Sequence, residues 1–303
     1  MATTGEGIGA PTTADIKQTE LVPGGSARRE ADTGAGSLLF IGTATTLIRY
    51  GGFTILTDPN FLHKGETVGI GYGTVRSKRL TEPALDIDDL PPLDLVVLSH
   101  CHEDHFDRVV ERRLNKRVPI VTTPEAASAL GSKGFRETRP LNTWEQVCFF
   151  KDPWTLTVTS LPGKHGPEPV NKFLPSVMGS MLEFRRVDSS ASLKLYVSGD
   201  TLIHERLHEI PQRYPRIDMG LFHLGGTRVF GLTLTMDGKQ GVEAVRIIAP
   251  DVAVPIHYDD YDVFKSPLED FKREVRAARL EGKVRYVGRG ERISLPSLDG
   301  RGR

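Results

Sequence analysis

The chain contains 303 residues, and its 39 lysines and arginines balance 39 aspartates and glutamates, so the formal net charge is zero. Such a chain lacks the positive field that non-specific nucleic-acid binding needs, and no stretch approaches the roughly 18 apolar residues of a membrane-spanning helix. Two cysteines are too few for a disulfide framework, and the first residues lack the basic start and apolar stretch of a signal peptide. We therefore expect a cytoplasmic protein without a nucleic-acid partner; the sequence does not indicate an oligomeric state.

The first 36 residues differ in composition from the rest of the chain. They are rich in Gly, Thr, Ala and Glu, and their few large apolar side chains bury too little surface to offset the entropy of ordering the backbone. We predict a flexible N-terminal arm over residues 1–36 and a single domain over residues 37–303, which is long enough for a large core.

Apolar runs and turn residues predict the elements of the domain in chain order. Strands are predicted at 38–41, 46–50, 53–57, 95–98, 118–122, 155–160, 178–186, 193–198, 219–224, 252–257 and 284–295. Helices are predicted at 107–115, 124–131, 202–210, 238–249 and 267–281. Asp107 and Pro124 suit the first positions of the first two helices. A β-rich first half followed by βα units favours two sheets packed face to face with helices outside, a four-layer αββα sandwich.

Residues 99–107 come directly after a predicted strand and concentrate metal-binding residue types. His100, His102 and His105 lie within six positions, with Asp104 among them. Imidazole nitrogen and carboxylate oxygen are ligands that zinc and similar divalent ions prefer. A chain that leaves a strand and turns can direct several such side chains at one point, so this loop predicts a metal site.

Three more candidate ligands, His165, Asp200 and His257, follow other predicted strands. Ligands in layered α/β folds gather at the loops on one edge of the sheets, so we expect these side chains to converge on the first cluster. The complete predicted ligand set is His100, His102, Asp104, His105, His165, Asp200 and His257. Seven ligands exceed the four that one tetrahedral ion takes, which implies two ions.

The order of these motifs resembles the metallo-β-lactamase superfamily over about residues 37–295. The matching residues are Asp58, the motif His100-x-His102-x-Asp104-His105, His165, Asp200 in Ser-Gly-Asp-Thr, and His257. The branch that contains L-ascorbate-6-phosphate lactonase and N-acylphosphatidylethanolamine phospholipase D is similar at three short segments. These are Thr57-Asp58-Pro59, Gly225-Gly226 and Pro255-Ile256-His257-Tyr258.

The resemblance implies how the ligands are divided between two metal ions. One ion would be held by His100, His102 and His165, and the other by Asp104, His105 and His257. Asp200 would bridge the two ions. Asp58 would lie behind the ligands as a hydrogen-bond acceptor that fixes the angle of a ligand imidazole.

A dinuclear zinc site with hydrolytic activity is the expected consequence, and manganese or iron could replace zinc because His and Asp discriminate weakly. Water between two cations loses a proton near neutral pH, so hydroxide would attack an ester-like bond in a lactone, phosphodiester, thioester or amide. Asp104 and Asp200 are expected to serve catalysis. His223, at the end of a predicted strand, could donate a proton to a leaving group or simply pack in the interior.

Other functions compete with this one. The segment His204-Glu205-Arg206-Leu207-His208 matches the helix motif of zinc metalloproteases, but no third ligand follows closely and Pro211 should end the helix, so an exposed helix is the alternative. Mononuclear iron sulfur dioxygenases share the scaffold and use fewer of its ligands. A flavin-linked diiron oxidoreductase would usually want glutamate in place of His102. A non-catalytic metal-binding module is the remaining alternative.

A glycine-containing loop at 61–79 is expected to cover the metals and bind an anionic or amphipathic substrate, although loop lysines and arginines are normally just solvated. Residues 168–176 and 228–236 could supply apolar walls. The predicted substrate residues are Phe61, Tyr72, Arg76, Lys78, Arg79, Phe173 and Phe230. Cys101 should point away from the histidines beside it as a buried, inert thiol, and His63 should lie on the surface.

Overall fold

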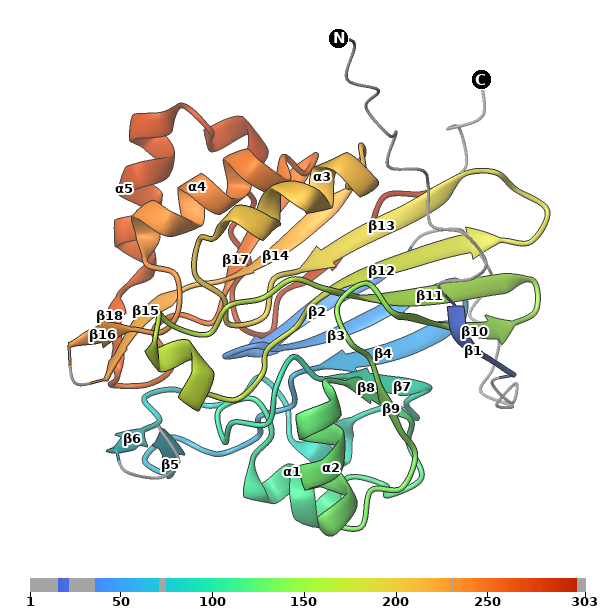
Figure 1. The fold of residues 1–303 in the computed structure, drawn as a ribbon, viewed down its shortest axis with the longest axis horizontal. Coiled ribbons are helices and arrows are strands. Elements are labelled where there is room, and N and C mark those ends of the chain that lie inside the picture. The colour runs from blue at the N-terminus through green and yellow to red at the C-terminus, as the bar shows by residue number, and fades with distance from the viewer. Residues whose placement is uncertain (1–15, 22–35, 71–74, 230, 299–303) are drawn as a thin grey trace, which may run out of the picture.

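The computed structural model describes residues 16–21, 36–70, 75–229 and 231–298, so the predicted substrate residues Tyr72 and Phe230 lie outside the described residues. Two large sheets pack face to face, and helices cover both outer faces (Figure 1). The predicted four-layer αββα sandwich is therefore confirmed.

The first sheet has seven strands within the described part of the chain. In spatial order they are β1 (Ile16–Leu21), β10 (Gln146–Lys151), β11 (Trp154–Leu161), β12 (Gly179–Arg186), β13 (Ser192–Val197), β14 (Met219–His223) and β17 (Val252–Ile256). Antiparallel pairing joins β10 through β13, whereas β13, β14 and β17 are parallel. The outer face is covered by η4 (Glu205–His208), α3 (Glu209–Arg213), α4 (Gly238–Ile248) and α5 (Leu268–Ala278).

The second sheet also has seven described strands. In spatial order they are β19 (Arg292–Ser294), β2 (Ser37–Gly42), β3 (Thr45–Tyr50), β4 (Phe53–Thr57), β7 (Leu95–Val97), β8 (Ile120–Thr122) and β9 (Thr138–Pro140). Its outer face is covered by α1 (Arg108–Arg113) and α2 (Pro124–Ser132). Smaller elements are the hairpin β5 (Thr67–Ile70) and β6 (Val75–Lys78), the sheet of β15 (Gly225–Val229), β16 (Leu232–Thr233) and β18 (Phe264–Ser266), and the turns η2 (Ile87–Asp89), η3 (Val170–Phe173) and η5 (Glu281–Lys283).

The main core lies between the two sheets because alternate side chains of each strand point to the same face. In β11, Leu156 and Val158 belong to this inner cluster, together with Phe184 of β12. Ile48 and Ile55 contribute from the second sheet. The sheets therefore form a fixed base from which the loops at their ends project.

Helices α1 and α2 begin where the sequence predicted. The carboxylate of Asp107 accepts hydrogen bonds from the amides of Val109 and Val110 at 2.8 and 2.9 Å, which satisfies amides that lack a partner in the helix. Thr123 accepts from the amide of Ala126 at 3.2 Å, ahead of Pro124 at the first helical position.

Two predicted elements were wrong. The helix expected at 202–210 is the short turn η4 followed by α3, and Pro211 lies in the first turn of α3, where a missing N–H removes no helical bond. The strand expected at 284–295 is reduced to β19, because Gly288 and Gly290, the latter at φ 80°, interrupt it. In addition, β10 was not predicted, and β1 lies within the predicted arm, where it pairs parallel to β10.

Among the described residues, no helix combines the length and apolar character needed to cross a lipid bilayer.

Candidate metal centre

The predicted ligands come from both sheets. In the second sheet, β7 leads into His100 and His102. In the first sheet, β11, β13 and β17 lead into His165, Asp200 and His257 respectively. The site therefore lies where strands of the two packed sheets end, as the sequence predicted for a layered fold.

The backbone is unusual at three positions of this site. Asp58 and His257 have positive φ angles of 36° and 60°. Residues other than glycine rarely adopt such angles unless the surrounding structure holds them there. Gly199 has φ 61°, and a Cβ atom there would lie 2.6 Å from the carbonyl oxygen of Met178. The turn that presents Asp200 therefore requires glycine.

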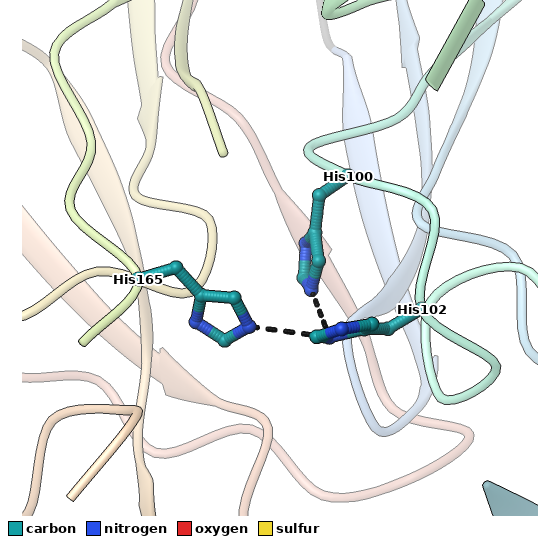
Figure 2. A group of neighbouring side chains, drawn as sticks. All are labelled: His100, His102 and His165. Carbon is teal, nitrogen blue, oxygen red and sulfur yellow. Dashed lines mark hydrogen bonds between the residues drawn. The ribbon is translucent and has the colours of Figure 1, made fainter. Parts of the chain in front are cut away.

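Three imidazoles form the first group of ligands (Figure 2). The Nδ1 atom of His102 lies 3.0 Å from Nε2 of His100 and 3.1 Å from Nε2 of His165. Zinc bonds to nitrogen of about 2.0–2.1 Å in tetrahedral geometry place ligand nitrogens about 3.3 Å apart, so these three nitrogens have nearly the spacing of ligands.

Asp104, His105, Asp200 and His257 form the second group, and all four are buried. His105 Nε2 lies 3.2 Å from Asp200 Oδ2, and His257 Nε2 lies 3.5 Å from Asp104 Oδ2. Although they are buried, the Nε2 atoms of His105 and His257 and the Oδ1 atom of Asp200 have no hydrogen-bond partner among the described residues. Buried polar atoms are normally satisfied, so this donor set fits a cation.

The electrostatics differ between the two groups. Burial lowers the pKa of His100 and His102, and lowers that of His165 to about 4, which favours the neutral ring that binds metals. Burial also opposes the charge of His105 and His257, but the carboxylates of Asp200 and Asp104 outweigh it and raise the pKa of both rings. The second group thus concentrates negative charge that favours a cation.

Asp58 and His223 lie behind the second group. Asp58 Oδ1 accepts from the amide and hydroxyl of Ser99 at 2.7 and 2.9 Å and lies 3.6 Å from His105 Nδ1. Its Oδ2 lies 3.4 Å from Nε2 of His223, whose backbone amide donates to Ser198 Oγ at 2.9 Å. Burial raises the pKa of Asp58, but His105 and His223 together lower it to about 2. His223 is fully buried against this carboxylate.

The predicted substrate residues occupy different environments. Arg76 and Lys78 are exposed on β6, whereas Arg79 is fully buried and its guanidinium donates to the side-chain oxygen of Asn60. Phe61 is buried in the cluster under α1 and α2. Neither Arg79 nor Phe61 therefore faces solvent. Phe173 belongs to η3, and its side chain is outside what the structure describes.

A cavity of about 320 Å³ opens beside His102, and Phe61, Arg76, Lys78 and Arg79 are not among its lining residues. Its walls are Gly69, Cys101, His102, Glu103, Glu125, Ala126, Ala129, Pro175 and Ser176. Glu103 accepts from the amide of Gly69 at 2.6 Å, and Glu125 accepts from the amide of Ser176 at 2.8 Å. The two carboxylates thus hold the hairpin and the segment before β12 against the ligand loop, and sequence reasoning missed both.

The competing metal motif does not form a ligand pair. His204 has an extended backbone before η4, while His208 is exposed on that turn. Neither belongs to a cluster of metal-ligand type in the described parts of the chain. Cys101 is partly buried and uncharged at neutral pH, because burial raises the pKa of its thiol. His63 is exposed, as predicted.

Comparisons with known proteins agree with this architecture. The family model described as "Beta-lactamase superfamily domain" matches residues 54–258. A UPF0173 metal-dependent hydrolase of Staphylococcus carnosus is 28% identical over 208 residues, which are 67% of this chain and 82% of that protein. An isothiocyanate hydrolase from Delia radicum gut bacteria has a TM-score of 0.71 at 21% identity, over 86% of this chain and 100% of that one. A structure from Veillonella parvula, described as a possible metal-dependent hydrolase, has a TM-score of 0.70 at 21% identity, over 86% and 99%.

Proposed function

This chain belongs to the beta-lactamase superfamily, and on that premise we propose that it is a hydrolase with two divalent cations, most simply zinc, that cleaves an ester-like bond in a small or amphipathic substrate. The observation that carries the proposal is the set of seven His and Asp side chains in two adjoining groups. In the second group, buried ligand-type atoms find no hydrogen-bond partner in the part of the chain that the structure describes. The relatives named as metal-dependent hydrolases support the same class of activity.

The candidate ligands are assigned to the two proposed ions by their groups. His100, His102 and His165 would hold one ion, Asp104, His105 and His257 the other, and Asp200 would bridge them. Such a pair of cations supplies a Lewis acid for the substrate's carbonyl or phosphoryl oxygen and lowers the pKa of water towards neutrality. Asp58 accepts a hydrogen bond from the amide of Ser99, which begins the loop at residues 99–107, and its carboxylate faces the ring of His105. It therefore fixes the start of this loop and the angle of the His105 ring.

The cavity beside His102 is the proposed place for the part of the substrate that flanks the scissile bond. Its apolar walls suit an acyl or alkyl group, and Glu103 and Glu125 disfavour an anion there. An anionic end of the substrate would instead be directed to the exposed Arg76 and Lys78 of the hairpin. Candidate substrates are lactones, phosphodiesters, thioesters, amides and, by likeness to the isothiocyanate hydrolase, isothiocyanates.

Metal content tests the proposal most directly. Protein purified without chelator should contain close to two zinc, manganese or iron ions per chain by elemental analysis, since the seven ligands exceed the four of one tetrahedral ion. It should also turn over at least one candidate substrate. Asp200→Ala should remove metal and activity together.

The matched control replaces His204 and His208 with alanine, which should leave metal content and turnover near those of the wild type. Loss of metal in this double variant, with retention in Asp200→Ala, would favour the metalloprotease motif. A reproducible single iron and no hydrolysis would favour the sulfur dioxygenase activity.

A further inference from the structure

Asn60 is fully buried, and each of its polar groups has a partner. Its backbone amide donates to Thr45 Oγ1 at 2.9 Å, and its backbone carbonyl accepts from Arg79 Nη1 at 3.3 Å. The side-chain Oδ1 accepts from the same guanidinium and from the hydroxyl of Tyr261 at 3.1 Å. The side-chain Nδ2 donates to the backbone carbonyl of Glu103 at 3.0 Å.

The partners fix the orientation of the Asn60 side chain. Arg79 can only donate and the carbonyl of Glu103 can only accept, so the oxygen of the amide must face Arg79 and the NH₂ group must face that carbonyl. The hydroxyl of Tyr261 then donates to the same amide oxygen. Arg79 and Tyr261 are themselves fully buried, and the guanidinium carbon lies 5.9 Å from the centre of the Tyr261 ring. One side of the amide is therefore held firmly by two segments that are distant in sequence.

The NH₂ group of the Asn60 amide contacts the loop at residues 99–107, which carries four of the candidate ligands. The carbonyl of Glu103 belongs to the peptide bond that leads into Asp104, and His105 follows directly. Both side chains belong to the second ligand group, in which the Nε2 atom of His105 has no hydrogen-bond partner within the described segments of the chain. A hydrogen bond to this carbonyl fixes the backbone from which the two ligands project, while His100 and His102 precede it.

We propose that Asn60, clamped by Arg79 and Tyr261, is a positioning residue that sets the affinity of the second metal group. The inference rests on the proposed dinuclear site. Groups that orient metal ligands typically change metal affinity by about 10- to 100-fold when they are replaced. The effect should fall on the second ion, because Asn60 holds the peptide bond that leads into Asp104. The three histidines of the first group do not depend on this hydrogen bond.

The test uses Asn60→Asp. The carboxylate has nearly the size of the amide and still accepts from Arg79 and Tyr261, but it cannot donate to the carbonyl of Glu103. Its charge is compensated by the buried Arg79 guanidinium, which favours folding. Asn115→Asp is the matched control, because Asn115 is exposed and its Oδ1, which accepts from the amide of Arg117 at 3.0 Å, is kept.

Both variants and the wild type are stripped of metal, and zinc is titrated back against a chelating indicator, with the Tm of the metal-free proteins measured in parallel. Asn60→Asp should weaken the second zinc about 10- to 100-fold and leave the first within about threefold, with the metal-free Tm close to that of the wild type. Asn115→Asp should match the wild type. Tyr261→Phe removes one hydrogen bond to Asn60 Oδ1 but keeps the hydrogen bond from Asn60 Nδ2 to the carbonyl of Glu103. This variant should therefore change the affinity for the second zinc less than Asn60→Asp does.

Unchanged affinity for the second zinc in folded Asn60→Asp would overturn the positioning role, as would equal weakening of both ions with a lower metal-free Tm. If Asn60→Asp does not fold, Asn60→Ala carries the same expected and contrary results. A wild type that binds a single ion overturns the dinuclear function and this inference with it. If the wild type binds two ions and hydrolyses a candidate substrate, and Asn60→Asp binds the second zinc as tightly as the wild type, only the positioning role is overturned.

Discussion

His165 and His257 share one arrangement of their two ring nitrogens. Each Nδ1 lies against a backbone carbonyl, that of Leu234 at 3.2 Å and that of Leu224 at 3.1 Å, and each Nε2 faces the other ligands of its group. Because a carbonyl only accepts, the proton of the neutral ring resides on Nδ1 and leaves Nε2 free to bind a cation. Two strand-end backbones thus determine which nitrogen is available.

His204 behaves differently, and its environment predicts a pH dependence of stability. Burial, helped by Lys164 and Arg206, lowers the pKa of this ring to about 4. The unfolded chain therefore takes up a proton near pH 6.5 that the folded protein resists down to about pH 4, so the free energy of unfolding should fall as pH decreases through this window. His204→Gln should lose that part of the slope in urea titrations at pH 7, 6, 5 and 4. An unchanged slope would contradict the neutral state of the partly buried His204 ring.

Elements near the site could be predicted from the sequence because buried strands of this fold are short apolar runs. The apolar runs before His100, Asp200 and His257 are the strands β7, β13 and β17, and each strand ends within one or two residues of its predicted end. The seven candidate ligands could be picked out for the same reason, because they follow such runs, whereas their division into two groups came from the family resemblance.

Elements whose pattern is mixed could not be predicted in this way. The strand β10, Gln146–Lys151, mixes polar and aromatic residues, and its long-range pairing with β11 over six positions and with β1 on the other side makes it a strand. Side-chain partners that depend on long-range packing were also missed. Arg79 was expected to bind substrate from the loop at 61–79, yet it is buried because Asn60, Thr81 and Tyr261 come together around it.

Helix α2 forms one wall of the cavity beside His102, and this gives a prediction for substrate size. Ala126 and Ala129 lie three residues apart on the face of α2 that lines the cavity. Ala129→Leu should fill the space and lower kcat/KM by tenfold or more for substrates with a bulky flanking group, while substrates with a small one lose far less.

The control is Ser128→Leu, which adds an exposed side chain on the same helix outside the cavity. It should leave the ratio of kcat/KM for bulky and small substrates at the wild-type value. An equal loss for both substrate sizes in Ala129→Leu would remove the cavity from the substrate path.

At the scale of the whole molecule, each of the two groups of candidate ligands combines residues that follow strands of both sheets. Within the first group, His100 and His102 follow β7 of the second sheet, while His165 follows β11 of the first. The second group likewise combines Asp104 and His105 with Asp200 and His257. Cations bound there would connect both halves of the sandwich at the edge where only loops meet.

Removing the metal should therefore destabilise the entire domain. A ligand present at about 100 times its Kd stabilises the folded state by about 2.7 kcal/mol, which corresponds to roughly 4–5 °C in Tm for a domain of this size. Calorimetry of the wild type before and after chelation should show a decrease of this order, and Asp200→Ala should show almost none. A wild-type Tm that is unchanged after verified removal of metal would contradict the joining role.

The pairing of β19 with β2 has a consequence for how the protein is made. Residues 292–294 complete the sheet by pairing with residues 37–39, which leave the ribosome about 250 residues earlier. Throughout that interval the outer edge of β2 has no strand beside it, although its side chains are almost wholly apolar. Open strand edges are sites where nascent chains can associate wrongly, so translation past residue 294 supplies the strand that closes this edge.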